Sequence, residues 1–425
     1  MTIAVFLGSL LGAMALGMPI AFALLVCGVA LMAYLGQFDA QIVAQNTING
    51  ADNFVLMAVP FFLLAGEFMN AGGLSRRIVD MAMAVVGHVR GGLGYVAIFA
   101  AIVMASLSGS AVADTAALAA LLVPMMREAG YNANRSCGLI ASGGIIAPVI
   151  PPSIGFIIFG VAGSVSITKL FISGIFPGIL MGLALVLTWW WLARSENVKT
   201  RPRPPVREVL RAVAAGLWAL MLPVIIVGGL KAGVFTPTEA AVVAAFYAMF
   251  VGLVVYRELK PADIYRCLLS AAKTTAVVMF LVAAAMVSVY LITVADLPGQ
   301  IAGLLAPFMD SPTLLMLAMM ALVVAVGTAL DFVPAVLILT PVLLPICRQA
   351  GIDPVYFGVL FIMNNAIGMV TPPVGVVLNV VSGIGKVSLD DAMKGVWPFL
   401  LAQLAVLLLL VLFPSLVTVP ARWFF

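Results

Sequence analysis

The chain has 425 residues, of which 64% are hydrophobic and only 9% are charged, and its mean hydropathy is +1.22. This composition leaves too little polar surface to cover a water-soluble globule, so it indicates an integral membrane protein. The long apolar runs favour an all-α polytopic protein over the alternating pattern of a barrel. The net charge of +4 comes from scattered basic residues without a basic face, which argues against nucleic-acid binding.

In chain order, the first half of the sequence (1-193) predicts five membrane crossings and one re-entrant hairpin. Spans of about 20 residues fall near 1–16, 17–35, 54–72, 136–168 and 172–193. The fourth of these is a broken helix, because it contains two adjacent prolines. The segment at about 93-127 is interrupted by small and polar residues, so it fits a hairpin that enters and leaves on the same side.

The second half (217-425) predicts the same order of elements. A basic, proline-rich linker at 194-216 joins it to the first half. Crossings follow near 217–230, 236–256, 274–295, 355–385 and 396–416. The fourth crossing is again broken, and a second re-entrant hairpin is placed at about 313-347.

Four pairs of short matches in the same order indicate an internal duplication. PMMREAG begins at Pro124, and PICRQAG begins at Pro345, 221 residues later. At nearly the same offset, the double proline of VIPPSIGF is repeated in VTPPVGVV. Weaker matches join GMPIAFA to FTPTEAA and AGGLSRRI to VADLPGQI. The sequence therefore predicts two copies of one unit that cover nearly the whole chain.

The distribution of Lys and Arg predicts that the two copies have opposite orientations in the membrane, since cytoplasmic loops collect these residues. The connector 36–53 has no Lys or Arg, whereas its counterpart 257–273 has four. The next pair reverses, with three in 74–92 and none in 296–312. This swap predicts an inverted-topology repeat with a cytoplasmic linker and both termini periplasmic.

The paired breaks predict a binding site at the middle of the membrane. Proline inside a helix leaves carbonyl groups without their helical partners. Such carbonyls can hold a cation, and the N-termini of half-helices can hold an anion. Two broken helices and two hairpin tips could together hold sodium and an anionic substrate. For a single double proline, a simple kink is the alternative interpretation.

Polar residues at the hairpin tips complete this predicted site. The first tip offers Ser106, Ser108, Gly109, Ser110, Asp114 and Thr115, and the second offers Gly327, Thr328 and Asp331. A carboxylate inside a membrane is a functional candidate, although Asp331 could instead cap the second arm of its hairpin. Asp114 is several residues from the position that aligns with Asp331, so the two halves are predicted to differ chemically.

Other polar residues favour structural roles. Glu67 and Glu239 are interpreted as packing or inter-helix hydrogen-bonding residues, and His88 lies in a segment typical of an interfacial helix. We find no phosphate-binding loop of the Walker type and no paired nucleophile and base. An ATPase and an intramembrane hydrolase are therefore both disfavoured, and the chain is not predicted to be an enzyme.

Several segments resemble one transporter family along essentially the whole chain. They are GMPIAF, VPFFLLAGEFMNAGGLSRRI, SGSAVADTAA, PMMREAGY, GGIIAPVIPPSIGFIIFG and NNAIGMVTPPVGVVLNV. They resemble the large, M-type membrane subunit of the TRAP (tripartite ATP-independent periplasmic) transporters, within the ion transporter superfamily. The resemblance implies a sodium-driven importer of organic acids in the bacterial inner membrane, in which a transport domain moves like an elevator against a scaffold.

The resemblance also implies partners and ligands. A periplasmic substrate-binding protein would deliver a C4-dicarboxylate, sialic acid or similar carboxylate, and a small four-helix membrane subunit is expected as a separate polypeptide. By position, the resemblance points to one sodium ion at Ser108, Ser110, Gly144, Ala147 and Val149, and to another at Gly327, Asp331, Gly368, Thr371 and Pro373. It points to substrate at Ser153, Asn365 and Thr371. A stand-alone sodium/carboxylate symporter of the same superfamily fold is the alternative function.

Overall fold

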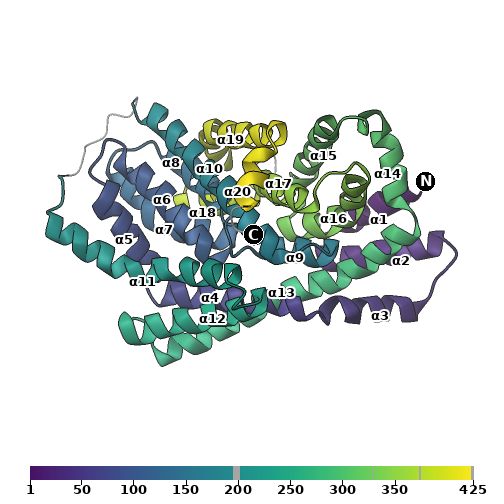
Figure 1. Cartoon of the computed structure of the whole chain (residues 1–425), viewed down its shortest axis with the longest axis horizontal. Coiled ribbons are helices and arrows are strands. Elements are labelled where there is room, and N and C mark those ends of the chain that lie inside the picture. Colours follow the sequence, from purple (N-terminus) through teal and green to yellow (C-terminus); the bar gives the residue numbers. More distant parts are fainter. Residues whose placement is uncertain (195–201, 329, 373–374, 423–425) are drawn as a thin grey trace.

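The computed structural model of the chain describes residues 1–194, 202–328, 330–372 and 375–422, and within these ranges every regular element is a helix (Figure 1). In this part of the chain, seven helices are long and apolar enough to cross a membrane. They are Phe54–Ala71, Ile167–Ala193, Val206–Lys231, Pro237–Val255, Pro261–Val294, Phe332–Gln349 and Leu389–Leu412. The prediction of a helical polytopic protein is confirmed.

The first half contains ten α-helices and one short 3₁₀-helix within the described residues. They are α1 (Thr2–Ala15), α2 (Ile20–Tyr34), α3 (Ala40–Ala51), η1 (Phe54–Met57), α4 (Ala58–Ala71), α5 (Leu74–Val86), α6 (Gly92–Ser108), α7 (Ala111–Glu128), α8 (Ala133–Gly144), α9 (Ile154–Gly163) and α10 (Ile167–Ala193).

The remaining helices follow in a matching order. They are α11 (Val206–Lys231), α12 (Pro237–Phe250), η2 (Val251–Val255), α13 (Pro261–Val294), α14 (Leu297–Leu305), η3 (Ala306–Phe308), α15 (Pro312–Gly327), α16 (Phe332–Gln349), α17 (Pro354–Gly368), α18 (Val376–Gly385), α19 (Leu389–Leu412) and α20 (Ser415–Arg422). From α6 to α10 and from α15 to α19, corresponding helices begin and end at nearly the same offset as the sequence matches. The opposite membrane orientation of the two halves stays a prediction.

The predicted interruptions lie where the structure breaks its helices. The first hairpin consists of α6 and α7, which are separated at Gly109 and Ser110, and the second consists of α15 and α16. The broken crossings become two pairs of short helices, α8 with α9 and α17 with α18. Proline and glycine supply these breaks because they remove a donor or permit a left-handed backbone.

The connectors are largely helical. The segment 74–92 contains α5, which agrees with the helix predicted in the segment of His88, whereas the segment 36–53 contains α3, which was not predicted. In the second half, α13 runs without interruption through most of 257–273, and α11 begins at Val206, inside the predicted linker. Residues 195–201 of that linker lie outside the described part. A helix satisfies its own backbone hydrogen bonds near the membrane surface, which favours helical connectors over loops.

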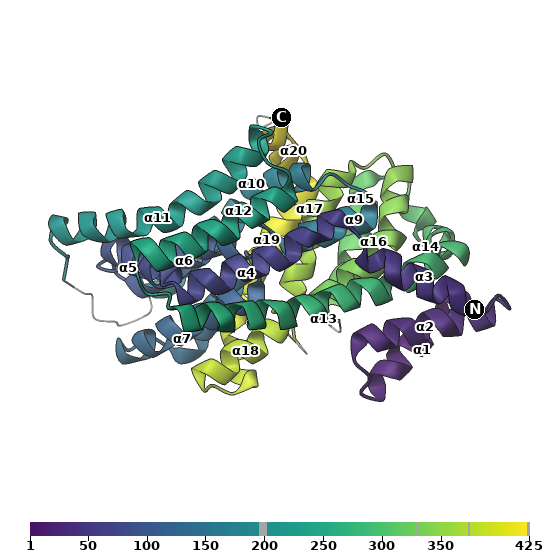
Figure 2. The same ribbon diagram turned by 90° about the horizontal axis from the view of Figure 1, so that it is seen from below.

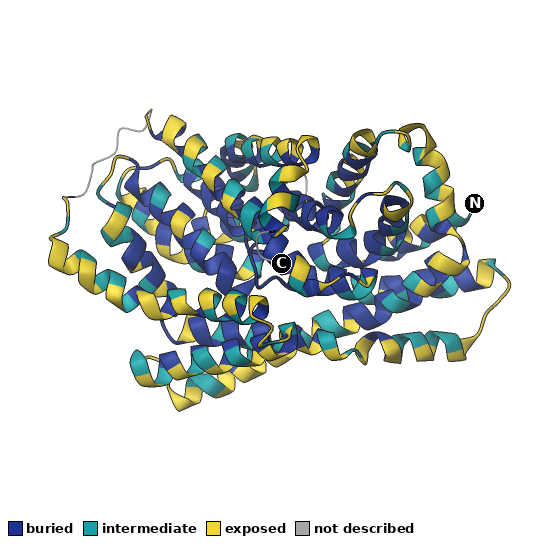
Figure 3. Cartoon of the chain, in the orientation of Figure 1, coloured by how far each residue is buried: buried dark blue, intermediate teal, exposed yellow. Residues whose placement is uncertain are grey.

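Two groups of helices make up the molecule (Figures 1 and 2). The long helices α11, α12 and α13 pack with α2 to α5 along one side, while the hairpins and broken helices pack together on the other. Figure 3 shows that exposed residues dominate α11, whereas α8, α9 and α17 are almost wholly buried. The first break, at residues 145–153, is therefore enclosed by protein, as the membrane requires.

The core crosses the boundary between the two halves. The Phe159 ring of α9 lies 6.2 Å from the Phe357 ring and 5.6 Å from the Phe361 ring, both of α17. These centroid distances are typical of favourable aromatic pairs. The hairpins and half-helices of both sequence halves therefore form one packed unit.

Glu67 and Glu239 have structural partners. Ser270 of α13 donates a 2.7 Å hydrogen bond to the Glu67 carboxylate of α4, which confirms the predicted inter-helix hydrogen bond. Glu239 forms a capping box with Thr236 at the start of α12. Glu67 thus joins two helices, whereas Glu239 is exposed and caps its own helix, so the packing or inter-helix role predicted for Glu239 was wrong.

Candidate functional site

The first hairpin tip contacts the break between α8 and α9. Gly109 links α6 to α7 with a left-handed backbone (φ 63°), and a Cβ atom added there would overlap the Pro152 carbonyl oxygen. Such a Cβ would also lie 3.2 Å from the Cα atom of Ser153. Glycine is required here for both its backbone angle and its lack of a side chain. The tip is thus pressed against the first broken helix.

Asp114 is buried directly behind this tip. The Ser108 hydroxyl donates a 2.5 Å hydrogen bond to Asp114 Oδ1 and accepts a 3.1 Å bond from the Ser110 N–H. Ser110 in turn caps α7, since its Oγ accepts from the Ala113 N–H at 3.4 Å. Asp114 is only 2% exposed, and its Oδ2 atom has no hydrogen-bond partner among the described residues. A free acceptor in such a position is costly unless a ligand uses it.

Thr115 places a second acceptor beside the end of α8. A Cβ atom added at Gly144 would overlap the Thr115 hydroxyl, so α7 and α8 approach each other closely. The Thr115 Oγ1 atom is buried and, in the described part of the chain, has no hydrogen-bond partner. The absence of a side chain at Gly144 leaves the space into which this hydroxyl projects. A larger residue at Gly144 would fill that space.

Nine residues connect α8 to α9, and not all of their main-chain carbonyl groups are directed towards the first tip. Ile146 and Ala147 donate turn hydrogen bonds to the carbonyls of Gly143 and Gly144, at 3.1 Å in both cases. The Val149 carbonyl instead faces Gly174 of α10, where an added Cβ would overlap it. Of the main-chain oxygens expected near the first tip, that of Val149 therefore points towards another helix.

Ser153 organises the start of α9. Its hydroxyl accepts a 3.2 Å hydrogen bond from the Phe156 N–H and donates to the Pro148 carbonyl. The residue is fully buried. The Ser153 side chain therefore caps the half-helix and ties it to the break, which fixes the helix N-terminus behind Gly109.

The second tip meets the second break by backbone contact. A Cβ atom added at Gly368 would lie 3.0 Å from both the carbonyl carbon and the Cα atom of Gly327. One added at Gly327 would lie 3.3 Å from Asn365 Oδ1. Asn365 is 1% exposed, and its Oδ1 atom has no hydrogen-bond partner among the described residues. The two glycines allow the tip to approach this amide oxygen.

Asp331 and Thr371 are less enclosed. Asp331 caps α16, and its Oδ1 accepts a 2.8 Å hydrogen bond from the Phe332 N–H. This confirms the capping interpretation, while a role in ion binding stays a prediction. Asp331 is exposed, and the Thr371 hydroxyl donates to the Ile367 carbonyl at 2.8 Å within its own helical turn. Pro373, the last residue predicted for this site, lies outside the described residues.

Phe332 joins the two half-sites into one region. Asn365 Nδ2 donates a 2.9 Å hydrogen bond to the Phe332 carbonyl. The Phe332 ring lies against Gly155 of α9, where an added Cβ would be 2.6 Å from the Cζ atom. The same Cβ would lie 3.3 Å from Ile362 of α17. The start of α9 is therefore wedged between two helices of the second half.

The structure brings the predicted residues together in two groups. Ser108, Ser110, Gly144 and Ser153 lie around the first tip, and Gly327, Asn365 and Gly368 lie around the second. The sequence analysis named Asp114 and Thr115 among the polar residues of the first tip but did not assign them to the sodium ion there, and it did not name Phe332. Asp114 had a usable signal, because it follows Ser110 by four residues and hence shares its helix face. No sequence feature pointed to Phe332, since apolar residues are common directly after a helix cap.

The arrangement suits a cation held by oxygen atoms. The unpaired atoms near the tips include a carboxylate, a hydroxyl and an amide oxygen, from Asp114, Thr115 and Asn365. All three can accept and are enclosed beside interrupted main chain, which is the environment in which membrane transporters coordinate sodium. The donor set fits a small hard cation, for which oxygen ligands are preferred.

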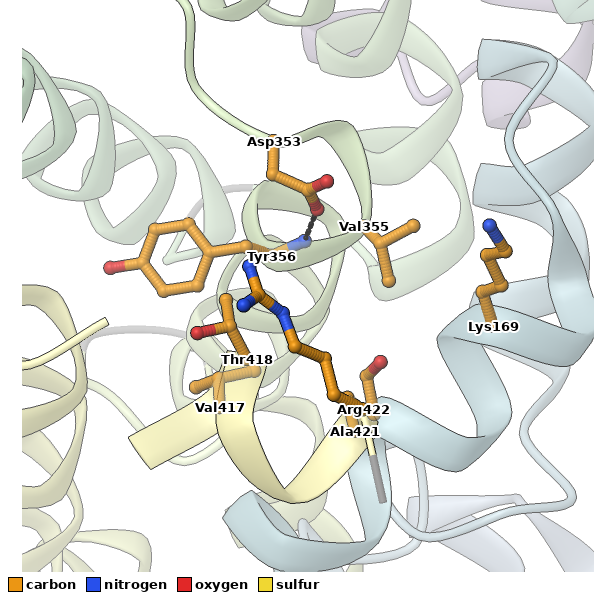
Figure 4. Close-up of a pocket in the computed structure, with 9 residues that line it drawn as sticks. Lys169, Asp353, Val355, Tyr356, Val417, Thr418, Ala421 and Arg422 are labelled. Atoms are coloured by element: carbon orange, nitrogen blue, oxygen red, sulfur yellow. Dashed lines mark hydrogen bonds between the residues drawn. The ribbon is translucent and has the colours of Figure 1, made fainter. Parts of the chain in front are cut away.

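A separate cavity of about 320 Å³ lies at the opposite end of α17 (Figure 4). Lys169 of α10 and Arg422 of α20 line it together with Asp353, whose carboxylate accepts a 2.7 Å hydrogen bond from the Tyr356 N–H. Fifteen residues of α17, about 22 Å of helix, separate this end from Gly368. The cavity is thus distinct from the region of the tips.

Comparison with known proteins assigns the family. The sequence pattern of the DctM component of the tripartite ATP-independent periplasmic (TRAP) transporters matches residues 7–416. The chain belongs to this family. It is similar to the 2,3-diketo-L-gulonate TRAP transporter large permease protein YiaN of Escherichia coli, with 58% identity over 423 residues and coverage of 100% of both chains. It is 38% identical to the sialic acid TRAP transporter large permease protein SiaM of Vibrio cholerae, over 95% of each chain.

A solved structure shows the same fold in a distant sequence. The YdaH transporter of Alcanivorax borkumensis matches 92% of this chain and 96% of its own, with a TM-score of 0.66 and 15% identity. As a TRAP permease, the chain is a multi-pass protein of the bacterial inner membrane, and it is a transporter component rather than an enzyme.

Proposed function

We propose that this TRAP permease is the translocating subunit of a sodium-coupled, binding-protein-dependent importer of an organic acid. Its partners would be a periplasmic substrate-binding protein and a small four-helix membrane subunit. The proposal assigns one sodium ion to the first tip and another to the second, with the substrate between them. It treats sodium as a coupling ion carried with the substrate.

The observation that carries the proposal is the set of unpaired oxygens beside the broken helices. Asp114 Oδ2 and Thr115 Oγ1 lie on one turn of α7 behind the first tip, and Asn365 Oδ1 lies behind the second. Each is buried without a hydrogen-bond partner in the described residues. Desolvation of such acceptors is unfavourable unless a cation or a donor offsets it. Sodium at both tips would offset it in both halves.

Charge complementarity favours an anionic substrate between the tips. The N-termini of α9 and α16 lie together, because Gly155 contacts Phe332. Helix N-termini carry partial positive charge and unpaired N–H groups, which attract a carboxylate. The relatives are named for 2,3-diketo-L-gulonate, sialic acid and C4-dicarboxylates, all of which carry a carboxylate. We therefore favour a carboxylate substrate, with a keto sugar acid as the first to test.

An elevator movement would use the two groups of helices. The hairpins and half-helices share one aromatic core across the sequence halves, so they would move as a unit. The group that contains α11, α12 and α13 would remain in the membrane as the scaffold. Such rigid-body rocking of one bundle against another is the usual way in which inverted-repeat transporters alternate access.

Uptake by reconstituted vesicles tests the function directly. The full complex, with binding protein and small subunit, is supplied with radiolabelled 2,3-diketo-L-gulonate, sialic acid or succinate under an inward sodium gradient. Accumulation of one of these is expected with sodium and not with choline or potassium. Equal accumulation in all three salts would reject sodium coupling. Uptake that does not need the binding protein would instead favour a stand-alone symporter.

The inverted orientation has its own test. Single cysteines introduced at Arg76, in α5, and at Gln300, in α14, are labelled with a membrane-impermeant thiol reagent in intact spheroplasts. A replacement of the buried native cysteines by alanine provides the background. We expect Gln300→Cys to react from the periplasm and Arg76→Cys to react only after lysis. Reaction of both from one side would reject the inverted repeat and the periplasmic termini.

A further inference from the structure

The repeated motif that begins at Pro124 and at Pro345 has no role in the proposed ion and substrate site. Each copy forms the last turns of the second arm of a hairpin, in α7 and in α16, and each places an arginine in the final turn. The two arginines, Arg127 and Arg348, are 221 residues apart, as are the motifs themselves. Both arginines are exposed at the ends of their helices, so their charge is not unusual in itself, but their matched positions call for a physical reason.

Both arginines make the same contact, and both contacts cross between the sequence halves. Arg127 Nη2 donates a 2.7 Å hydrogen bond to the Gly385 carbonyl, at the C-terminal end of α18. Arg348 Nη2 donates a 2.9 Å hydrogen bond to the Gly163 carbonyl, at the C-terminal end of α9. The first half thus holds a half-helix of the second, and the second half holds a half-helix of the first.

Close packing supports each contact. A Cβ atom added at Gly163 would lie 2.6 Å from Leu344 Cδ2, and one added at Gly385 would lie 3.6 Å from Val123 Cγ1. Leu344 precedes Arg348 by four residues, as Val123 precedes Arg127, so in each helix the two side chains share one face. Gly163 lets α9 approach α16 closely, whereas Gly385 meets α7 at an ordinary contact distance and is crowded instead by Cys137 Sγ of α8, 2.6 Å from an added Cβ. In each interface the arginine lies at the end. Figure 2 shows α7 and α18 side by side.

Helix direction explains why the residue is a cation. Gly155, at the start of α9, lies against Phe332 at the start of α16, while Gly163 lies against Thr340 and Leu344 near its end. The two helices therefore run parallel, with both N-termini at the candidate site. Both C-termini, which carry partial negative charge, end near Arg348. One guanidinium group can stabilise both ends and donate a charge-assisted hydrogen bond to a terminal carbonyl.

We infer that Arg127 and Arg348 are crossed positioning residues, each of which holds the half-helix that builds the binding region of the opposite half. Arg348 holds α9, whose N-terminus at Ser153 backs the first tip. Arg127 holds α18, whose N-terminus follows the second break. Loss of Arg348 should therefore disturb the first half-site, and loss of Arg127 the second. The expected effect of these losses on ion binding rests on the proposed function, whereas their expected effect on the stability of α9 and α18 does not.

Hydrogen exchange measured by mass spectrometry tests the clamp without reference to transport. The purified full chain is compared with Arg127→Met and Arg348→Met, in sodium-free buffer. Arg348→Met should speed amide exchange in α9 by about tenfold, the factor expected when a hydrogen bond to a charged group is lost, and leave α18 unchanged. Arg127→Met should do the reverse. Arg76→Met, a change of an exposed arginine on α5, is the matched control and should alter neither.

Two results would overturn the inference. One is faster exchange in the half-helix of the same sequence half, and the other is an equal change in both half-helices. If a methionine variant does not yield folded protein, Arg348→Gln and Arg127→Gln make the same comparison, because glutamine keeps a donor and removes the charge. Arg→Lys variants, which keep the charge at the helix ends, should restore most of the protection.

Uptake then separates positioning from general destabilisation. Arg348→Met should raise half-saturating sodium about tenfold with a smaller change in maximal rate, and Arg348→Lys should largely restore it. When Arg348→Met is combined with Ser110→Ala at the first tip, the two effects on half-saturating sodium should not be additive. When it is combined with Asp331→Asn at the second tip, they should be additive. The opposite pairing would overturn the crossed assignment. The exchange changes expected for the two variants, found together with sodium-independent uptake, would instead reject sodium coupling and leave the clamp intact.

Discussion

The two hairpin tips share a backbone plan but differ in where they keep their carboxylate. At the first tip, Ser110 caps α7 and the carboxylate of Asp114 is buried one turn further on. At the second, Asp331 itself caps α16 and is exposed, while the buried polar groups are the amides of Asn364 and Asn365. The two tips share the same order of helices, and the side chains that complete each half-site differ.

This difference has an energetic consequence. A carboxylate at an exposed cap is hydrated and contributes modestly, whereas a buried carboxylate with one unpaired oxygen strongly favours a bound cation. The neutral amide of Asn365 favours a cation less than a carboxylate does. The first half-site is therefore expected to depend more on its charged side chain, and the second more on backbone and amide oxygens.

The largest effect is expected from Gly109→Ala. The left-handed backbone and the overlap of a Cβ with Pro152 should together cost roughly 2–5 kcal/mol. Thermal unfolding of the purified chain and sodium-dependent uptake measure the loss. Gly327→Ala is the comparison at the second tip: its backbone is not left-handed, so the chain should lose less stability, but its Cβ would lie 3.3 Å from Asn365 Oδ1 and should weaken sodium dependence there. Equal damage from both changes would mean that the tips are packed alike.

The second-largest effect is expected from Asp114→Asn. The amide keeps an acceptor for the Ser108 hydroxyl but removes the charge, so half-saturating sodium should rise by roughly tenfold to hundredfold, the range for interactions with a charged group. Uptake as a function of sodium concentration measures it. An unchanged sodium dependence with normal uptake would show that Asp114 only holds Ser108.

Asn365→Ala should have an intermediate effect. It removes the 2.9 Å bond to the Phe332 carbonyl and the unpaired oxygen near Gly327. One neutral hydrogen bond corresponds to about a fivefold rise in half-saturating sodium. Asn364→Ala is the control, since Asn364 Nδ2 donates a 2.6 Å hydrogen bond to the Met320 carbonyl of α15, and its Oδ1, although also unpaired among the described residues, is not one of the nearest neighbours of Gly327 at the tip. It should lower the unfolding temperature without changing the sodium dependence. A shift of sodium dependence in both variants would contradict this division of roles.

The smallest effect is expected from Asp331→Asn. Asparagine is as good a helix cap as aspartate and keeps one side-chain oxygen for an ion, so half-saturating sodium should change by about twofold. The same uptake assay measures it beside Asp114→Asn. A larger effect than that of Asp114→Asn would reverse the ranking of the two half-sites.

Much of this arrangement could be predicted from the sequence because its signals are local. Double prolines, the polar tips and the repeated motif placed both hairpins and both broken helices within a few residues of their observed bounds. Asp331 was recognised as a possible cap because capping depends on its own helix. The helix in the segment of His88 was predicted from its amphipathic pattern, whereas the helical connector α3 was missed, since amphipathic helices near a membrane surface give a weaker signal than apolar crossings.

The sequence by itself determined the membrane class, the order of the helices and the points at which they break, because apolar length and proline chemistry act within a single segment. Only the tertiary structure decided that α9 packs on α16 and α18 on α7, and that Asp114 and Thr115 are enclosed while Asp331 is exposed. Those outcomes depend on contacts between residues far apart in the chain. No local pattern records which half-helix will meet which hairpin.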